Sequence, residues 1–316
     1  MAIYEIKDGV GIIPEGTTVI EEGAFEEAEE LTSVVIPNSV TKIDVGAFSG
    51  CTSLTSIIIP DSVTEIEYYA FYGCTSLKSI DIPNSVTTIG VDAFQDCVGL
   101  TSLVISSSVT KIGREAFGAF RGCKNLVSIV VSESNPVYDS RNNCNAIIET
   151  ASNSLILGCR NTVIPDTVTK ISGDAFFGGT APSDITFPES VTVIGSDSDI
   201  LGDIGAFKDC VGVTNIVIPE SVTNIFRSAF EGCTDLKTVE IKAKPKYIDT
   251  EVFKNCTSLE SVILPAGIGK FKNGDWGYPT AFEGCTALKA ICVPAKKADY
   301  YKKRLPQELH RLIVEQ

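Results

Sequence analysis

The sequence predicts a solenoid, a fold in which short coils of the chain stack on one another around a shared core. Near-identical segments recur, as a comparison of residues 36–57, 59–80 and 218–239 shows. Proline marks their register from Pro14 to Pro83 with a constant step of 23 residues. Each segment carries eight apolar positions, which one coil cannot bury alone but which stacked coils bury together.

Each repeat contains two short extended pieces and one turn. In residues 54–60 a β-branched stretch ends at Pro60, which lacks the N–H that a further ladder bond needs, so we expect a short strand here. Residues 61–74 follow neither a period of 2 nor one of 3.6, which suits a second extended piece and a tight helical turn. The residues expected to point inward are Leu54, Ile57, Ile59, Val63, Ile66, Ala70, Phe71 and Cys74.

A phenylalanine and a cysteine keep the same period. The phenylalanines expected to align are Phe25, Phe48, Phe71, Phe94, Phe176, Phe207, Phe230, Phe253 and Phe282. Near residue 120 the motif is doubled, and Phe120 keeps the register better than Phe117 because it lies three residues before Cys123. Eight of the eleven cysteines occupy that place: Cys51, Cys74, Cys97, Cys123, Cys210, Cys233, Cys256 and Cys285. No CxxC or CxxH spacing favours zinc, so we expect a ladder of buried, reduced thiols.

Interruptions of the period divide the chain into blocks within one expected domain. The blocks are an N-terminal cap (1–12), a first repeat block (13–131), a β-hairpin insertion (132–164), a second repeat block (165–294) and a C-terminal helical cap (295–316), together one domain over 1–316. The caps are expected because an open stack would expose unpaired strand edges. In the C-terminal cap, Pro306 fits the first turn of a second helical segment.

The insertion contains the pattern of a β-hairpin. Residues 145–149 and 154–158 are apolar and flank a polar turn. If Glu149 pairs with Ser154, Cys144 lies opposite Cys159, at a separation close to what a disulfide needs. We therefore hypothesise a disulfide between these two cysteines under oxidising conditions, the alternative being two buried thiols.

Composition and charge exclude several classes of protein. Of the 316 residues 44% are hydrophobic, which is too many for a disordered chain. The net charge of −14 repels phosphate backbones and anionic headgroups, so we expect no nucleic-acid partner. No run approaches the roughly 18–20 apolar residues of a membrane helix, so we expect no membrane insertion. Glu5, Lys7 and Asp8 interrupt the place where a signal peptide would be apolar.

The sequence favours no catalytic or metal site, and we expect neither an enzyme nor a cofactor. The single histidine, His310, lies in the charged tail, and no GxSxG, HExxH or GxxxxGK[ST] pattern occurs. In residues 139–145 the acidic spacing of a calcium loop fails, because Arg141 takes a ligand position. Asp197, Asp199 and Asp203 could gather around calcium, but a solvated acidic loop is the favoured interpretation.

The repeat LxxIxIPxSVTxIxxxAFxxCxxL resembles the BspA-like subclass of bacterial leucine-rich repeat proteins over residues 12–294. This resemblance implies a leucine-rich repeat solenoid, a right-handed β/α superhelix with short parallel strands on its concave face and extended or helical turns on its convex face. Members of the family are typically secreted or cell-surface proteins that bind host or matrix proteins. The resemblance thus implies the cell surface or secretion, whereas a native start at Met1 would favour the cytoplasm.

Two surfaces are candidates for a partner. One row of outward-facing strand residues is mostly apolar: Val35, Ile58, Asp81, Val104, Val130, Thr186, Val217, Glu240, Ile263 and Cys292. Such an apolar ribbon beside a row of small polar residues fits a protein contact, although the preference of strands for β-branched residues explains it equally. The second surface is Tyr68, Tyr69 and Tyr72 in one turn, which could also be chance packing.

These features predict a non-enzymatic recognition module that holds a protein partner on its concave face. An intracellular leucine-rich repeat scaffold of the same shape is the alternative. A glycan ligand is a more distant one.

Overall fold

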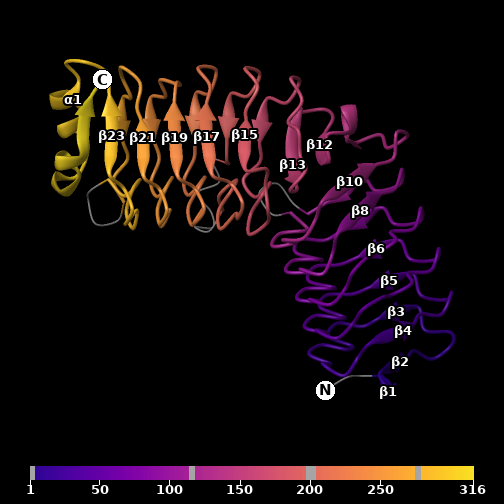
Figure 1. Ribbon diagram of the computed structural model, residues 1–316. Coiled ribbons are helices and arrows are strands. Elements are labelled where there is room, and N and C mark those ends of the chain that lie inside the picture. Colours follow the sequence, from indigo (N-terminus) through magenta and orange to yellow (C-terminus); the bar gives the residue numbers. More distant parts are fainter. Residues whose placement is uncertain (1–3, 114–117, 197–203, 275–278) are drawn as a thin grey trace. The chain divides into compact units, whose positions relative to one another are not determined.

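The computed structural model describes residues 4–113, 118–196, 204–274 and 279–316, and divides into two compact units (Figure 1). Unit 1 comprises Met1–Ala151 and Leu157–Asn161, and unit 2 comprises Ser152–Ile156 and Thr162–Gln316. Both units are built from short parallel strands that repeat from coil to coil, as the solenoid prediction requires. The expectation of a single domain over 1–316 stays a prediction.

Unit 1 has two lines of strands. One line comprises β1 (Glu5–Lys7), β2 (Val10–Ile12), β4 (Ser33–Val35), β8 (Ser102–Ile105) and β10 (Ser128–Val131). The other is the five-stranded parallel sheet of β3 (Val19–Ile20), β5 (Lys42–Ile43), β6 (Glu65–Ile66), β7 (Thr88–Ile89) and β9 (Lys111–Ile112). Each residue of this sheet pairs with its equivalent one repeat later, as Ile43 does with Ile66, which confirms the predicted register.

The strand expected over residues 54–60 is not formed. Between this segment and the preceding coil the backbone bond is Thr55 N to Thr32 O at 3.1 Å, and the next coil adds only Lys78 N to Thr55 O at 3.4 Å. One such bond per coil holds the segments side by side, but a ladder needs bonds at successive alternate residues. The segment therefore keeps the predicted inward-facing residues without becoming a strand.

Unit 2 repeats the two lines. In one, Ser154 and Leu155 of β13 (Ser154–Gly158) begin a parallel series that continues through β14 (Lys170–Ile171), β16 (Val193–Ile194), β18 (Asn224–Ile225), β20 (Tyr247–Ile248) and β22 (Lys270–Phe271). The other is a six-stranded sheet of β15 (Asp184–Thr186), β17 (Asn215–Ile218), β19 (Thr238–Ile241), β21 (Ser261–Ile263), β23 (Ala290–Val293) and β24 (Ile313–Glu315).

The core of each unit contains a file of phenylalanine rings. In unit 1 the centroids of Phe48 and Phe71 lie 5.1 Å apart with the rings 6° from parallel, and Phe94 stacks on Phe120 in the same way. In unit 2 the file runs from Phe176 to Phe282 with centroids 4.6–5.6 Å apart. The file confirms that Phe120 keeps the register; Phe117 lies outside the described residues.

The cysteine ladder is also confirmed, with an interaction that the sequence did not reveal. Seven of the eight ladder cysteines are buried, and Cys285 is half-buried. The thiol of Cys74 donates a hydrogen bond to the carbonyl oxygen of Phe48, one coil earlier, at 3.1 Å, and Cys256 does the same to Phe230. Cysteine is therefore used for its weak S–H donor as well as for its small size.

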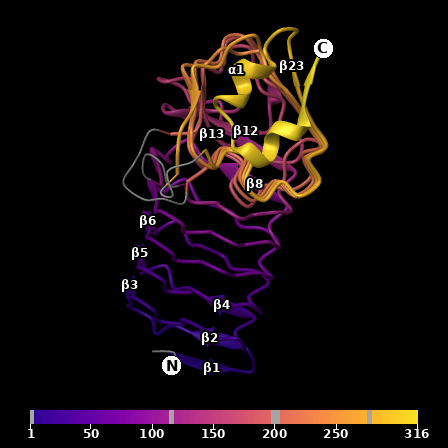
Figure 2. The same ribbon diagram turned by 90° about the vertical axis from the view of Figure 1, so that its left-hand side faces the viewer.

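The C-terminal cap consists of α1 (Ala298–Lys302), the 3₁₀-helix η2 (Gln307–Leu312) and β24, and its helical part crosses the end of the last coil (Figure 2). Tyr301 is fully buried, and its hydroxyl donates to Pro265 O at 2.6 Å. Pro306 was expected in the first turn of the second helical segment and is instead its N-cap residue, with an extended ψ of 148° directly before η2. The additional strand, β24, was not predicted; it pairs with β23 and places Ile313 opposite Ile291.

The insertion forms the predicted hairpin. β12 (Ala146–Glu149) and β13 are neighbouring strands, and β11 (Tyr138–Asp139) adds antiparallel to β12, preceding the short 3₁₀-helix η1 (Arg141–Asn143). Cys144 and Cys159 are both buried. The Sγ of Cys159 lies 3.3 Å from Asn145 O, and the Sγ of Cys144 lies 3.9 Å from Ala146 O. The cross-link between them stays a prediction.

Oxidation of the purified protein is expected to link Cys144 to Cys159 and no other pair. Closing this short loop would stabilise the fold by about 3 kcal/mol in the chain-entropy model. Burial raises the pKa of Cys144 to about 11, so little thiolate is present at neutral pH and the reaction should be slow. Thiol counting in denaturant, with peptide mapping, measures the outcome. Eleven reactive thiols after oxidation would contradict the hypothesis, and Cys292→Ser is the control that should leave the link unchanged.

Candidate interaction surface

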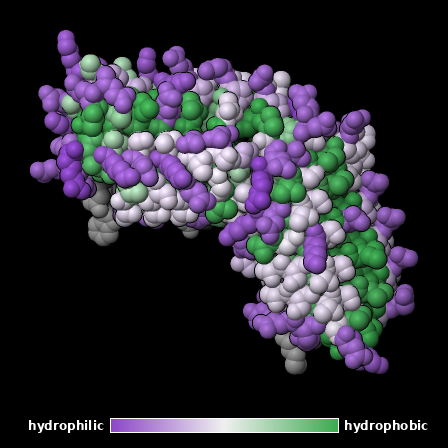
Figure 3. All heavy atoms as spheres, in the orientation of Figure 1, coloured by the Kyte–Doolittle hydropathy of each residue, from purple (hydrophilic) through white to green (hydrophobic). Residues whose placement is uncertain are grey.

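The outward-facing side chains of unit 1 form an apolar row. Strands β8 and β10 alternate buried and outward residues, so every second side chain is directed away from the core. Val35 is 69% exposed, Ile58 82%, Val104 54% and Val130 48%. Figure 3 shows hydrophobic side chains gathered along this line of unit 1. We call these four residues, with Asp81 between Ile58 and Val104, the apolar row.

Strand pairing extends the apolar row by one residue at its N-terminal end. Val104 pairs with Val130, and Val35 pairs with Ile12, which is 44% exposed. Ile12 was not among the predicted contact residues. The signal that identifies it is its position two residues before Pro14, the offset that every member of the row keeps in a repeat with proline.

Unit 2 has the corresponding row, but its composition is different. Thr186, Val217, Glu240, Ile263 and Cys292 pair in the predicted register. Cys292 was expected to meet water and is buried, because β24 and the cap pack against the last coil. Val163 was missed, although it lies two residues before Pro165 and is 70% exposed.

Beside this row, unit 2 carries a ladder of polar side chains. The Nδ2 of Asn215 donates to Asp184 at 2.7 Å, and the hydroxyl of Thr238 donates to Oδ1 of Asn215 at 2.6 Å. In unit 1 the same places are taken by serines, among them Ser33 and Ser102. The apolar character of the strand surface is therefore concentrated in unit 1, and that of unit 2 is mixed.

The three predicted tyrosines share one turn of unit 1. Tyr68, Tyr69 and Tyr72 are each more than one third exposed, and the rings of Tyr69 and Tyr72 meet edge to face with centroids 6.0 Å apart. Tyr69 has a φ of 58°, in the left-handed region that bulky residues rarely adopt. The structure thus brings these three side chains together at one exposed place.

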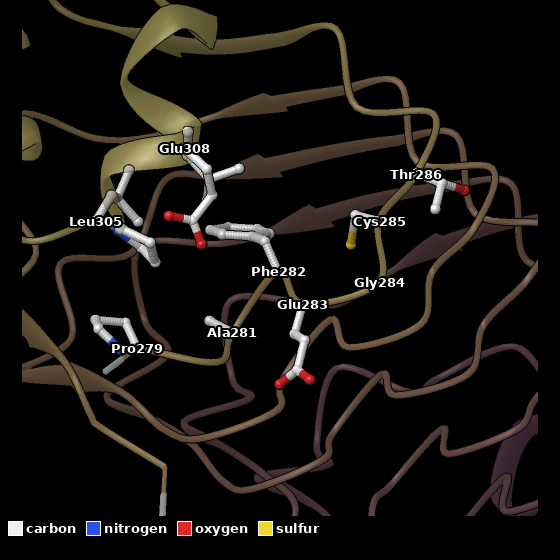
Figure 4. A pocket seen from close by; sticks show the side chains of 11 residues that line it. Pro279, Ala281, Phe282, Glu283, Gly284, Cys285, Thr286, Leu305 and Glu308 are labelled. Atoms are coloured by element: carbon white, nitrogen blue, oxygen red, sulfur yellow. The ribbon is translucent and has the colours of Figure 1, made fainter. Parts of the chain in front are cut away.

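Unit 2 has two clefts on its surface. One, of about 310 Å³, lies between the last coil and the cap, where Leu305 and Glu308 face Phe282 and Ala281 (Figure 4). The thiol of Cys285 at its edge donates to Phe253 O at 3.0 Å, and burial raises its pKa to about 12, which makes it a poor nucleophile. The other cleft, of about 360 Å³, is next to Val163 and Thr186.

The described residues contain no cluster of side chains suited to metal binding. No group of three His, Cys, Asp or Glu side chains in them could hold a metal ion. His310 lies with its Nε2 3.0 Å from Leu305 O, at the end of the cap. Asp197, Asp199 and Asp203, considered for calcium, lie outside the described residues. No helix in the described part of the chain is long and apolar enough to cross a membrane.

The repeat matches the model of a known protein family. The family model of the BspA type leucine rich repeat region, which spans six copies of the repeat, matches residues 11–127, 155–273 and 203–304. The chain belongs to the BspA-type leucine-rich repeat family. No curated protein sequence matches this chain.

Solved structures of bacterial leucine-rich repeat proteins share the fold of this BspA-type chain. A leucine-rich repeat protein from Eubacterium ventriosum is 26% identical with a TM-score of 0.73, over 88% of this chain and 70% of that one. A leucine rich cell surface protein from Faecalibacterium prausnitzii is 26% identical with a TM-score of 0.69, over 92% of this chain and 80% of that one. The pneumococcal vaccine antigen PcpA, 17% identical with a TM-score of 0.51 over 95% and 84% of the two chains, shows the fold alone.

Membership of the family agrees with the surface chemistry. Leucine-rich repeat arrays are non-enzymatic in type and generally mediate protein interactions, because their stacked coils present long continuous surfaces. In this BspA-type protein the apolar row sets exposed apolar side chains at the same place in several coils of unit 1.

Proposed function

We propose that this chain is a non-enzymatic adhesion module of the bacterial cell surface that binds a host or matrix protein through the apolar row of unit 1. The observation that carries the proposal is the exposure of Val35, Ile58, Val104 and Val130 in one line. Exposed apolar residues in contiguous rows are uncommon on surfaces without a partner, since they favour association. The Faecalibacterium prausnitzii structure, named as a cell surface protein, supports the location.

The row has the composition of an interface core. Its four apolar members are β-branched and lose little side-chain entropy when they are covered, because their χ1 angles are already restricted. Serines such as Ser102 and Ser128 lie beside it and can supply hydrogen bonds at a polar rim. A protein surface with complementary apolar side chains would therefore bury the row and meet polar groups at its border.

Substituting glutamate for both Val104 and Val130 is expected to weaken binding to the partner by about 100-fold, since the interface would then have to bury two charges. The free energy of unfolding should fall by no more than about 1 kcal/mol, because both side chains are exposed but the two like charges would lie opposite each other on paired strands. Surface plasmon resonance against a panel of purified extracellular-matrix proteins measures the affinity, and urea denaturation measures the stability.

The matched control is the double variant Asn38→Glu and Asn84→Glu, which adds the same two charges at exposed turn positions where the coil between them carries Asp61. It should bind as the unmodified protein does. Equal affinity of the Val104/Val130 variant and this control would remove the apolar row as the binding surface. Failure of every matrix protein to bind the unmodified chain would count against a matrix partner.

A further inference from the structure

A second surface of unit 1 is suited to a different kind of contact. We propose that the tyrosine patch, Tyr68, Tyr69 and Tyr72, acts with the exposed glutamates of the first coil to bind an arginine- or lysine-rich segment of a protein. This site is separate from the apolar row, so the proposal does not depend on the function proposed above. It rests on the exposure of the rings, the backbone of Tyr69 and the charge beside them.

Tyr69 is placed where folding alone would favour a smaller residue. Its φ of 58° is matched by Gly23 at 62° and Gly46 at 61° in the two preceding coils, and by Asp92 at 54° in the next. A bulky side chain in this left-handed conformation is strained, whereas glycine adopts it freely. The ring of Tyr69 is 44% exposed, so it adds little to the core in return. Ser228 at 54° and Glu251 at 61° share this conformation in unit 2, so it belongs to the repeat, but an exposed aromatic ring held there remains available for contact with a ligand.

The turns of successive coils stack directly, which places the tyrosines in line with glutamates. Gly46 N donates to Tyr68 O at 2.9 Å, and Gly23 N donates to Val45 O at 3.0 Å. By the 23-residue step, Glu22 is the equivalent of Tyr68 two coils earlier. Two coil steps correspond to about 10 Å, the distance between second-neighbour strands in a sheet. The coil between them carries the half-buried Val45 at this step, with Gly46 and Ser49 at the places of Tyr69 and Tyr72, so a bound segment would pass over one short apolar side chain.

The first coil supplies a concentration of negative charge without internal compensation. Its exposed acidic residues are Glu21, Glu22, Glu26, Glu27, Glu29 and Glu30. Among the described residues no lysine or arginine forms a salt bridge with any of these six. In the following coil, Lys42 is held by Asp44 at 3.3 Å and Glu67 at 3.1 Å. A cationic ligand would therefore meet carboxylates that are free to pair with it.

Tyrosine rings and carboxylates together select a cation. Guanidinium groups stack on tyrosine faces, and this protein already contains that contact in unit 2, where the Arg304 guanidinium lies 3.6 Å from the ring centroid of Tyr300. An extended segment rises about 3.3 Å per residue, so three or four residues would reach from the tyrosine patch to the glutamates of the first coil. A neutral glycan could stack on the rings but would gain nothing from the charge.

The probe for this site is a fluorescent dodecapeptide of alternating arginine and glycine, followed by anisotropy at low salt. The double variant Tyr68→Ala/Tyr72→Ala should bind it about 5- to 10-fold more weakly, through the loss of two cation–π contacts at an exposed site. Tyr69→Gly should also bind more weakly, while its urea midpoint stays the same or rises because the strain is relieved. If the tyrosines had only a structural role, their replacement would lower stability as well as binding. Weaker peptide binding at unchanged stability therefore supports a binding role.

Charge-matched variants separate the site from the overall acidity of the chain. Glu22→Gln/Glu26→Gln should weaken peptide binding by about threefold or more at low salt, whereas Glu189→Gln/Glu220→Gln, with the same net charge, should not. A probe with citrulline in place of arginine should bind the unmodified protein and the Glu22→Gln/Glu26→Gln variant equally weakly, because citrulline carries no charge. Equal loss in the two glutamine variants, unchanged binding by the tyrosine variants, or tighter binding of a neutral chitin hexasaccharide than of the peptide would each overturn the proposal.

Discussion

Replacing Phe71 by alanine is expected to lower the free energy of unfolding by about 3–5 kcal/mol. The ring is fully buried and stacks on both neighbours, Phe48 and Phe94, with centroid distances of 5.1 Å. Alanine would remove both stacking contacts and leave a cavity that rigid coils above and below cannot fill. Because each coil is stabilised only by its neighbours, the loss at one position weakens the coils on both sides.

Urea denaturation followed by circular dichroism measures this effect. Ile58→Ala is the control, since its side chain is 82% exposed and its truncation should change the free energy of unfolding by less than about 0.5 kcal/mol. A change of less than about 1 kcal/mol for Phe71→Ala would mean that the file of rings is not what holds the coils together.

The register could be predicted from the sequence because two residue types with strong physical preferences repeat at fixed spacing. Proline cannot continue a ladder, and a phenylalanine in the interior must find another apolar group, so both positions are tied to one place in the coil. This is why Phe120 could be assigned from its distance to Cys123. The same logic extends to Val163 and Ile12, which the offset from proline identifies but which lie beside interruptions of the period.

Features that depend on neighbouring coils could not be predicted from one repeat. Residues 54–60 have a β-branched composition and yet form no strand, because strand formation depends on the distance to the next coil. Cys292 looked like an outward-facing residue and is buried by β24, a strand with no repeat signature. The hydrogen bond from each ladder thiol to a phenylalanine carbonyl joins two coils and has no pattern within either of them. The apolar row, proposed as the binding surface, likewise forms only when the coils are stacked.

The ladder thiols are expected to resist alkylation at pH 8 in the native protein and to react fully in denaturant. Burial is the main cause that raises the pKa of Cys51 and Cys123 to about 12, against an ordinary value of 9.0. Because only the thiolate reacts, a rise of three units lowers the reactive fraction about 1000-fold at this pH. Iodoacetamide labelling with peptide mapping by mass spectrometry, in buffer and in guanidinium chloride, measures the ratio. Half-buried Cys285 is expected to react first.

The same pKa shifts give the pH dependence of stability a definite sign. Above pH 9 the unfolded chain loses thiol protons while the native chain keeps them up to about pH 12 at Cys51 and Cys123, so the native state binds more protons. The stabilisation is therefore complete below pH 9 and is lost as the pH rises towards 12. Urea midpoints measured from pH 7 to pH 11 should stay level up to about pH 9 and decrease above it. The midpoint of the Cys51→Ala variant should decrease less steeply over the same pH values. Rapid native labelling of Cys51 in a chain that stays folded would show that the thiols are not protected by the stack.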